Sequence, residues 1–338
     1  MNISILKNCS TYLNAKQKCA LISIDLRKAF DLVDHNILMQ KLKSYGCDGK
    51  SLKWFKSYLD NRFQFVVYNN HISDVKKTRV GVPQGSCLAP LLFSIFINDI
   101  TKLNLNGILY LFADDMNLVV SAKTYIDLET KINSDLYNIN NWFKKHRLVP
   151  NLTKSNYMIM GCPPKSVEMN VILGNRPLKR VFDSKVLGVT FDHDLRFESH
   201  INNICKKISQ RISFISRLRY IVPQHVTNLV FKSLVLPIFD YCDIVWCFTY
   251  EKHLKKLDIL QKRAARVITF SNINENTEEL IRTLNWLPTR KRFEFHTLCY
   301  IFKALNKLGS NVSSNYFEIV TKFSQRTGDS LKLKLPNI

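Results

Sequence analysis

Two aspartates stand side by side between two apolar runs, and this doublet constrains the fold more than any other feature of the sequence. Asp114 and Asp115 follow residues 109–112 and precede residues 118–120, and both flanks have the composition of β-strands. The segment LYLFADDMNLVV therefore predicts a hairpin that carries the acids at its tip. Adjacent carboxylates lose solvation and repel each other there, so they need either a solvated turn or a cation.

A third carboxylate lies at the end of another predicted strand. Residues 20–25, ALISID, have the pattern of a buried strand that ends in Asp25, 89 residues before Asp114. If the two strands are neighbours in one sheet, the three acids converge at one edge. Mg²⁺ is a hard cation that prefers oxygen ligands, and two such ions ~3.5–4 Å apart support an in-line phosphoryl transfer. The alternative interpretation of the doublet remains a solvated turn.

The two halves of the chain differ in pattern. In the first half, helices are predicted near residues 34–46, 50–61, 86–100 and 124–146, and strands or hairpins near 62–70, 109–120, 155–161 and 185–192. In the second half, basic amphipathic helices are predicted at 198–219, 224–246, 251–269 and 288–307, before an extended tail over 324–338. We therefore expect an α+β domain over residues 1–194 and an all-helical region over 195–338.

The charge points to a polyanionic partner. Lys and Arg number 49 against 27 Asp and Glu, a formal net charge of +22, spread along the whole chain. Such an excess favours nucleic acid or an acidic membrane surface, the alternative being a protein that is merely basic. The sequence has no run long enough to span a bilayer and no secretory signal, and its nine cysteines are scattered without zinc-binding spacing. We expect a nuclear or cytoplasmic protein with no membrane contact.

Two further motifs accompany the acids. In DLRKAFDLVDH, residues 25–35, Phe30 lies five positions after Asp25. In GVPQGSCLAPLLF, residues 81–93, Gln84 offers a donor and an acceptor, and Gly85 allows close approach of the backbone to a ligand. Taken singly, Phe30 is equally compatible with a core position and the Gly/Pro turn with a helix start.

Together and in this order, the motifs resemble those of the reverse transcriptases of non-LTR retrotransposons of the jockey-like LINE type. The similar segments are residues 20–38, 81–100, 109–115, 148–161, 185–197 and 217–247. The first five segments are motifs in a fixed order, and such a series is far more specific than a lone glycine-rich loop. The resemblance implies a polymerase palm, with an antiparallel sheet, helices and a catalytic hairpin, followed by a helical thumb and C-terminal region.

The resemblance also implies metal-binding roles. Asp25 and Asp114 would be the main ligands of two Mg²⁺ ions and Asp115 the third, with Mn²⁺ as a substitute. Lys154 matches a lysine that assists the leaving pyrophosphate as a general acid or as a positive charge. The alternative for Lys154 is a solvated loop lysine.

The nucleotide-binding roles follow the same resemblance. Phe30 would be a steric gate whose ring occupies the place of a ribose 2′-hydroxyl and so favours deoxynucleotides. Gln84 and Gly85 would contact the incoming nucleotide and the template.

The implied activity is RNA-directed DNA polymerisation, in which a DNA primer 3′-hydroxyl is extended on an RNA template with dNTPs. Basic helices of the thumb would hold the RNA/DNA duplex by its phosphates, the alternative being solvated helix faces. Only 24 residues precede Asp25, where this family has its fingers and, in full-length elements, an endonuclease. We therefore expect an N-terminally truncated copy whose fingers are largely missing. The alternative function is a catalytically inactive relic that only binds nucleic acid, and a third possibility is a fragment without a stable fold.

Overall fold

The computed structural model describes the chain except for residues 162, 164–166, 309–317, 321–331 and 335–338. The chain forms two compact units. The first contains Met1 and Ala15–Leu187, and the second contains Asn2–Asn14 together with the chain from Gly188 onward. The first unit therefore ends before the boundary expected at residue 194. Helix α1 (Asn2–Asn14) groups with the second unit, which the sequence did not predict.

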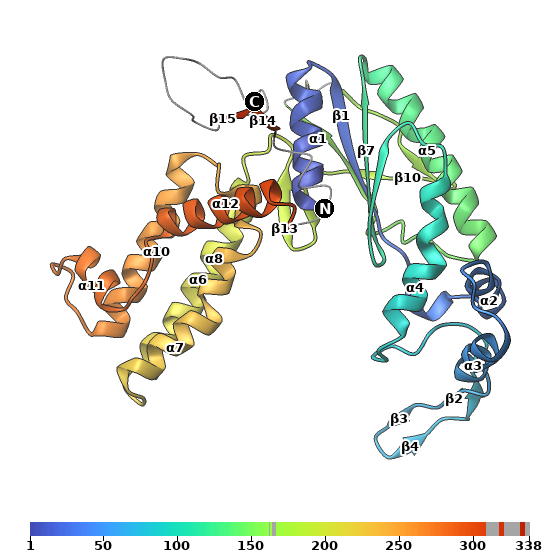
Figure 1. Cartoon of the computed structure of the whole chain (residues 1–338), viewed down its shortest axis with the longest axis horizontal. Coiled ribbons are helices and arrows are strands. Elements are labelled where there is room, and N and C mark those ends of the chain that lie inside the picture. The colour runs from blue at the N-terminus through green and yellow to red at the C-terminus, as the bar shows by residue number, and fades with distance from the viewer. Residues whose placement is uncertain (162, 164–166, 309–317, 321–331, 335–338) are drawn as a thin grey trace. The chain divides into compact units, whose positions relative to one another are not determined.

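A five-stranded, mainly antiparallel sheet forms the centre of the first unit (Figure 1). Its strand order is β11 (Lys179–Arg180), β8 (Asn156–Met160), β1 (Lys18–Ile24), β7 (Asp115–Ala122) and β6 (Ile108–Phe112). β1 runs antiparallel to both β7 and β8, and only β11 pairs in parallel. Apolar residues dominate β1 and β7, and burial of nearly every position makes these strands the rigid middle of the sheet.

Four helices pack with one face of this sheet in a single core. They are α2 (His35–Ser44), α3 (Gly49–Leu59), α4 (Ala89–Ile97) and α5 (Tyr125–His146). Ala20, Ile22 and Ile24 of β1 contribute alternate side chains to that core, as the two-residue period of a strand requires. The Thr124 side chain begins α5 by accepting a hydrogen bond from the Asp127 amide, and Arg147 ends it with a φ of 57°. The expected α+β architecture is confirmed.

Short strands and turns complete the sheet-containing part of the chain. The remaining elements are β2 (Phe63–Gln64), β3 (Val67–Tyr68), β4 (His71–Ile72), β5 (Lys76–Lys77), η1 (Ala29–Leu32), η2 (Asn98–Lys102), β9 (Ile172–Leu173), β10 (Arg176–Pro177), β12 (Asp183–Val186) and β13 (Val189–Asp192). β13 opens the second unit.

The second unit is mainly helical, although the described part of the region over 195–338 that was expected to be all-helical also contains two short strands, and one predicted helix is interrupted. Its helices are α6 (Glu198–Leu218), α7 (Gln224–Leu234), α8 (Leu236–Asp240), α9 (Asp243–Trp246), α10 (Glu251–Thr269), α11 (Thr277–Thr283) and α12 (Thr289–Leu305). The prediction of one helix over 224–246 was wrong. Pro237 has no amide hydrogen to continue α7, and Cys242 adopts a left-handed φ of 53° between α8 and α9.

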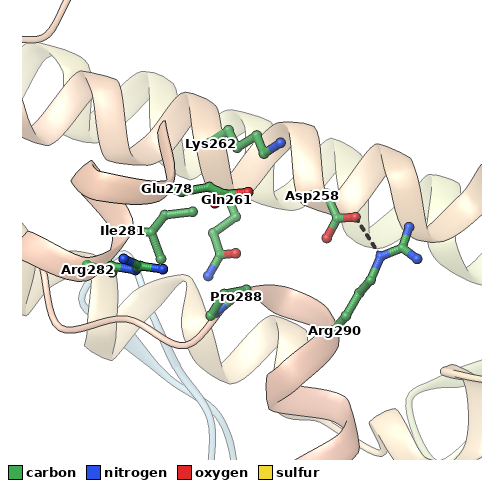
Figure 2. A pocket seen from close by; sticks show the side chains of 8 residues that line it. All are labelled: Asp258, Gln261, Lys262, Glu278, Ile281, Arg282, Pro288 and Arg290. Carbon is green, nitrogen blue, oxygen red and sulfur yellow. Dashed lines mark hydrogen bonds and ion pairs between the residues drawn. The ribbon is translucent and has the colours of Figure 1, made fainter. Parts of the chain in front are cut away.

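Helices α10 and α11 and the start of α12 surround a pocket of about 320 Å³ in the second unit (Figure 2). Gln261 is buried at its wall, where its amide nitrogen donates to the Leu287 carbonyl and its oxygen accepts from the amide and hydroxyl of Thr289. Arg290 pairs with Asp258 and Glu251. Gln261 and Arg290 thus have partners within the protein, and their bonds fix the start of α12.

The extended tail expected over 324–338 lies mostly outside the described residues. Within it, Lys332–Lys334 forms β15 and pairs with β14 (Glu318–Val320). Among the helices that the structure describes, none is long and apolar enough to cross a membrane.

Candidate active site

The three predicted acids lie together at one end of the central sheet. Asp25 directly follows β1, and Asp115 is the first residue of β7. β1 and β7 are antiparallel, and Ile24 pairs with Met116. Asp25, which follows Ile24, and Asp115, which precedes Met116, therefore lie at the same end of the strand pair. Asp114 occupies the two-residue turn that joins β6 to β7, since Phe112 pairs with Asp115.

The hairpin turn has an unusual backbone. Ala113, the residue before Asp114, has a φ of 51°, a left-handed conformation that residues with a Cβ adopt rarely. The turn is held by the antiparallel pairing of β6 with β7, whose second strand is buried over most of its length. The strand pair thus positions both carboxylates of the doublet through backbone geometry.

The electrostatics of Asp115 show that the three acids interact. Desolvation is the largest effect that raises the pKa of the Asp115 carboxyl above its ordinary value, and the charges of Asp114 and Asp25 raise it further. Such mutual repulsion is what a bound cation would relieve.

Three carboxylates provide the oxygen donors that Mg²⁺ or Mn²⁺ prefers, so the residues fit the expected metal by their chemistry. Within the described ranges, no three His, Cys, Asp or Glu side chains are grouped closely enough to hold a metal ion as they stand. Asp115 is exposed and Asp114 half-buried, so both side chains have room to reorient.

A first pocket, of about 230 Å³, opens beside Asp25 and Asp115. Lys154 lies on its wall, as do Asn117, Asn156 and Ser184. The structure therefore brings the predicted lysine to the same pocket as two of the three acids, although its side chain is exposed. An exposed lysine in this position leaves both interpretations of Lys154 open.

A turn that the sequence reasoning missed holds Asp25 in place. The Asn151 side-chain amide donates to the Asp25 carboxylate at 2.9 Å, and the Asn151 backbone amide donates to the Asp25 carbonyl at 2.7 Å. The Ser155 hydroxyl accepts from the Asp25 amide and donates to the Asn151 carbonyl. The sequence feature that could have indicated this turn is the placement of Asn151 and Ser155 on either side of Lys154, in the loop after Pro150.

A second pocket, of about 420 Å³, unites the other predicted residues. Phe30, Gln84, Gly85 and Asp114 line it together with Lys28. Residues separated by more than 50 positions in the sequence thus meet in this pocket. The tip of the hairpin serves both pockets, because Asp114 lines the second pocket and Asp115 lines the first. Lys28 was not predicted, and it brings an exposed positive charge to the pocket.

Two hydrogen-bonded loops bring Phe30 and Gln84 to the second pocket. The Val82 amide donates to the Phe30 carbonyl at 2.8 Å, and the Gly81 amide donates to the Val33 carbonyl at 2.7 Å. A Cβ on Gly81 would lie 2.8 Å from the Asp31 carbonyl oxygen, so this close approach needs glycine. The half-buried ring of Phe30 stacks on Phe93, with centroids 4.7 Å apart, and is thereby fixed at the pocket wall.

Gln84 and Gly85 are held differently in the second pocket. The Gln84 side chain donates to the Asp31 carboxylate at 2.8 Å, so one of its groups already has a partner within the protein. Gly85 has a φ of 83°, and a Cβ there would meet nothing within 4 Å. Its backbone conformation, rather than crowding, accounts for the glycine in this structure.

The basic helices of the second unit present cations on their exposed faces. Exposed cations occur along α6 and α10: Lys206, Lys207, Arg211, Arg217, Lys252, Lys255, Lys256, Lys262 and Arg263. His200 of α6 differs from these residues, because it is only 4% exposed. Burial lowers its pKa to about 4, assisted by Lys207, so it is a neutral core residue.

Comparison with known proteins agrees with these features. A family described as reverse transcriptase (RNA-dependent DNA polymerase) matches residues 2–191. The probable RNA-directed DNA polymerase from transposon X-element of Drosophila melanogaster is 24% identical over 98% of the chain, which covers 35% of that protein. Two further relatives come from the same organism. The probable RNA-directed DNA polymerase from transposon BS is 28% identical over 84% of the chain, which covers 33% of that protein. The RNA-directed DNA polymerase from mobile element jockey is 27% identical over 77% of the chain, which covers 29% of that protein.

The chain thus spans about a third of the length of these relatives. Among solved structures, telomerase from Candida albicans in complex with a telomeric RNA fragment has a TM-score of 0.42 and 10% identity, over 84% of this chain and 49% of that one. Apo telomerase from Candida tropicalis has the same TM-score and 12% identity, and the match covers 88% of this chain and 54% of that one. The family match extends over more than half of the sequence, and the chain belongs to the reverse transcriptase family.

Proposed function

We propose that this chain carries the RNA-directed DNA polymerase activity of a non-LTR retrotransposon of the jockey kind. The convergence of Asp25, Asp114 and Asp115 at one end of the central sheet, between the two pockets, is the observation that carries the proposal. One pocket adds Lys154 and the other adds Phe30, Gln84 and Gly85. The substrates would be a DNA primer on an RNA template and dNTPs.

Asp25 and Asp114 would hold two divalent cations, with Asp115 as a further ligand. When bound, Mg²⁺ or Mn²⁺ would activate the primer 3′-hydroxyl and stabilise the charge that develops on the pyrophosphate. Asn151 keeps the Asp25 carboxylate oriented through its 2.9 Å hydrogen bond, so this ligand needs little rearrangement.

Lys154 would act on the leaving group. Its exposed ammonium can rotate toward the first pocket, where it would donate a proton or a positive charge to the pyrophosphate. Lys28 would bind the same triphosphate from the second pocket.

Phe30 would select the sugar. Its ring is fixed by Phe93 and lies at the wall of the pocket that also contains Asp114, so a 2′-hydroxyl on the bound nucleotide would meet carbon instead of a hydrogen-bond partner. The Gln84 amide would reach the nucleotide or the template after it releases Asp31.

Primer extension tests this function. The purified chain should add dNTPs to a DNA primer on an RNA template in the presence of Mg²⁺, and Asp114→Asn with Asp115→Asn should remove the activity. Asp60→Asn, an exposed acid that lines neither pocket, is the matched control and should leave the activity unchanged. Incorporation by the folded double variant at the wild-type rate would refute the site. Binding of the primer–template without incorporation by the wild-type chain would favour the inactive nucleic-acid binder instead.

A further inference from the structure

A hairpin arm, formed by residues 62–79, stands apart from the core of the first unit (Figure 1). Every residue from 62 to 77 is exposed, on both faces of the strand pair. The arm connects α3 with the loop that contains Gln84 and Gly85. None of its side chains is needed for the candidate active site.

The fold of the arm is set by its backbone. β3 and β4 are joined by Asn69 and Asn70, whose φ values of 45° and 62° are typical of the two-residue turn that suits a twisted hairpin. Backbone hydrogen bonds from Thr78 to Arg62 and from Ser73 to Val66 align the strands below this turn. The arm therefore keeps its shape without burying its own apolar side chains.

Large apolar side chains nevertheless cover the arm. Phe63, Phe65 and Tyr68 are 61%, 54% and 74% exposed. Val66, Val67, Ile72 and Val75 are exposed beside them. An unbacked two-stranded hairpin gains little stability from such residues, and exposed rings on an edge strand carry an aggregation risk. A binding role accounts for their presence better than folding does.

The charges of the arm indicate the class of partner. Four basic residues, Arg62, Lys76, Lys77 and Arg79, accompany a single acid, Asp74. Phe63 lies directly opposite Lys77 in the strand pair, so a ring and a cation share one face. Aromatic rings with cations beside them match a chain of bases and phosphates, because rings stack on bases while cations bind the backbone.

We propose that the arm binds single-stranded nucleic acid. A duplex stacks its bases on one another and offers no base face to Phe63, Phe65 or Tyr68, whereas an unpaired strand does. A second copy of this basic arm would be repelled by like charge. Binding of a single strand by the arm does not depend on the proposed polymerase function. Only the identity of that strand, the unpaired part of the template, rests on the proposed function.

The attachment of the arm would place a bound strand near the nucleotide pocket. Val80, at the base of the arm, pairs with Asp34, and the next residues carry the hydrogen bonds to Phe30 and Val33. Four residues after Val80 the chain reaches Gln84 on the pocket wall. The arm and the pocket are thus connected through a short, well-bonded segment of the same unit.

Fluorescence anisotropy with a labelled single-stranded RNA of about 12 nucleotides tests the proposal. Phe63→Ala with Tyr68→Ala should weaken binding at least about tenfold, since stacking contributes ~1–3 kcal/mol per base. Tyr137→Ala, an aromatic on α5 that is 66% exposed, is the matched control and should bind like wild type.

A second pair of variants tests how much the lysines of the arm contribute to RNA affinity. Lys76→Gln with Lys77→Gln should reduce the slope of log affinity against log salt by about 1.4, because each phosphate contact contributes ~0.7 for single strands. Lys144→Gln with Lys145→Gln removes the same charge from exposed positions of α5 and should leave that slope unchanged. All these side chains are exposed, so circular dichroism should show wild-type folding.

The arm proposal would be overturned if the aromatic variant bound the single strand as tightly as Tyr137→Ala does. It would also be overturned if the aromatic variant lost affinity for a blunt duplex of the same sequence to the same extent. A loss of self-association in the aromatic variant, with unchanged RNA affinity, would assign the arm to a protein partner and also overturn it. Asp114→Asn with Asp115→Asn should bind the single strand normally. Wild-type binding without any incorporation would therefore count against the polymerase function while the arm proposal stands.

Discussion

At the scale of single residues, the site depends on partners that hold the acids as well as on the acids themselves. Asn151 contacts both the carboxylate and the carbonyl of Asp25, and Ser155 contacts its amide. These contacts join loops that are 126 residues apart. A local pattern identifies Asp25 as the end of a strand, but it carries no information on which loop closes over that end.

Asn151→Ala should loosen the Asp25 carboxylate. A hydrogen bond to a charged group contributes ~1.5–3 kcal/mol, so we expect about a tenfold loss of incorporation rate at low Mg²⁺. Because the ligand itself remains, a higher Mg²⁺ concentration should recover part of the rate. A Mg²⁺ titration of single-nucleotide incorporation, with Mn²⁺ binding followed by electron paramagnetic resonance, provides the measurement.

Asn133→Ala is the matched control for this prediction. Asn133 also makes two hydrogen bonds to another loop, to Asn170 and Ile172, but it lies on α5 outside both pockets. It should lower thermal stability without shifting the Mg²⁺ dependence. Equal Mg²⁺ dependence in the two variants would show that Asn151 only stabilises the fold.

Phe30→Val should relax sugar selection. The shorter side chain leaves room for a 2′-hydroxyl, so the preference for dNTP over rNTP, measured as the ratio of kcat/KM values, should fall at least about tenfold. Loss of the stacking on Phe93 should lower stability by about 1–2 kcal/mol. Phe112→Val, next to the hairpin turn and 60% exposed, should retain the wild-type ratio. An unchanged ratio in Phe30→Val would remove Phe30 from the role of gate.

At the scale of elements, the strands and helices that follow strong patterns were predictable and the breaks between them were not. The hairpin around the acids, the long helix α5 and the strand before Asp25 all follow clear periodicity. The three short helices over 224–246 keep an amphipathic pattern throughout, so periodicity alone hides their ends. Backbone geometry at Pro237 and Cys242 decides those ends.

The catalytic hairpin offers a test of backbone strain. Ala113→Gly should stabilise the protein by about 1 kcal/mol, because glycine adopts the left-handed φ of this turn without the steric penalty of a Cβ. Ala122→Gly, at the buried end of β7, should instead destabilise it, since it loses packing and gains chain entropy in the unfolded state. Chemical denaturation measures both. Destabilisation of similar size in the two variants would contradict the strain at Ala113.

At the scale of the whole molecule, the order of the motifs predicted the family but not how the chain groups into two units. The +22 charge and the order of motifs agree with the reverse transcriptase family. The grouping of α1 with the second unit was not predictable, because it depends on distant contacts such as that of Asn2 with Cys242, 240 positions apart. Exposed cations on α6 and α10 were predictable from helical spacing, whereas the buried neutral state of His200 was not.

His200 should make stability pH-dependent. Its folded pKa of about 4 lies below the ordinary value of 6.5, so the unfolded state takes up a proton first as the pH falls. Stability is therefore complete above about pH 7 and is lost below it, by about 2 kcal/mol at pH 5. The sign is that of a histidine that stays neutral in the core.

His200→Gln should remove this part of the pH dependence, while the exposed control His225→Gln should retain it. Urea denaturation at pH 7.5 and pH 5 measures the difference. Parallel loss of stability in the wild-type protein and His200→Gln would contradict the assignment.

The central claim is that Asp25 and the Asp114–Asp115 hairpin form one metal-dependent polymerisation site. The most direct test is single-nucleotide incorporation by the purified chain on an RNA template with a DNA primer, compared between the wild-type protein, Asp25→Asn and Asp60→Asn. We expect Mg²⁺-dependent incorporation of the complementary dNTP by the wild-type protein and Asp60→Asn, with a loss of at least about a thousandfold in Asp25→Asn. Wild-type incorporation rates in a folded Asp25→Asn variant would contradict the central claim.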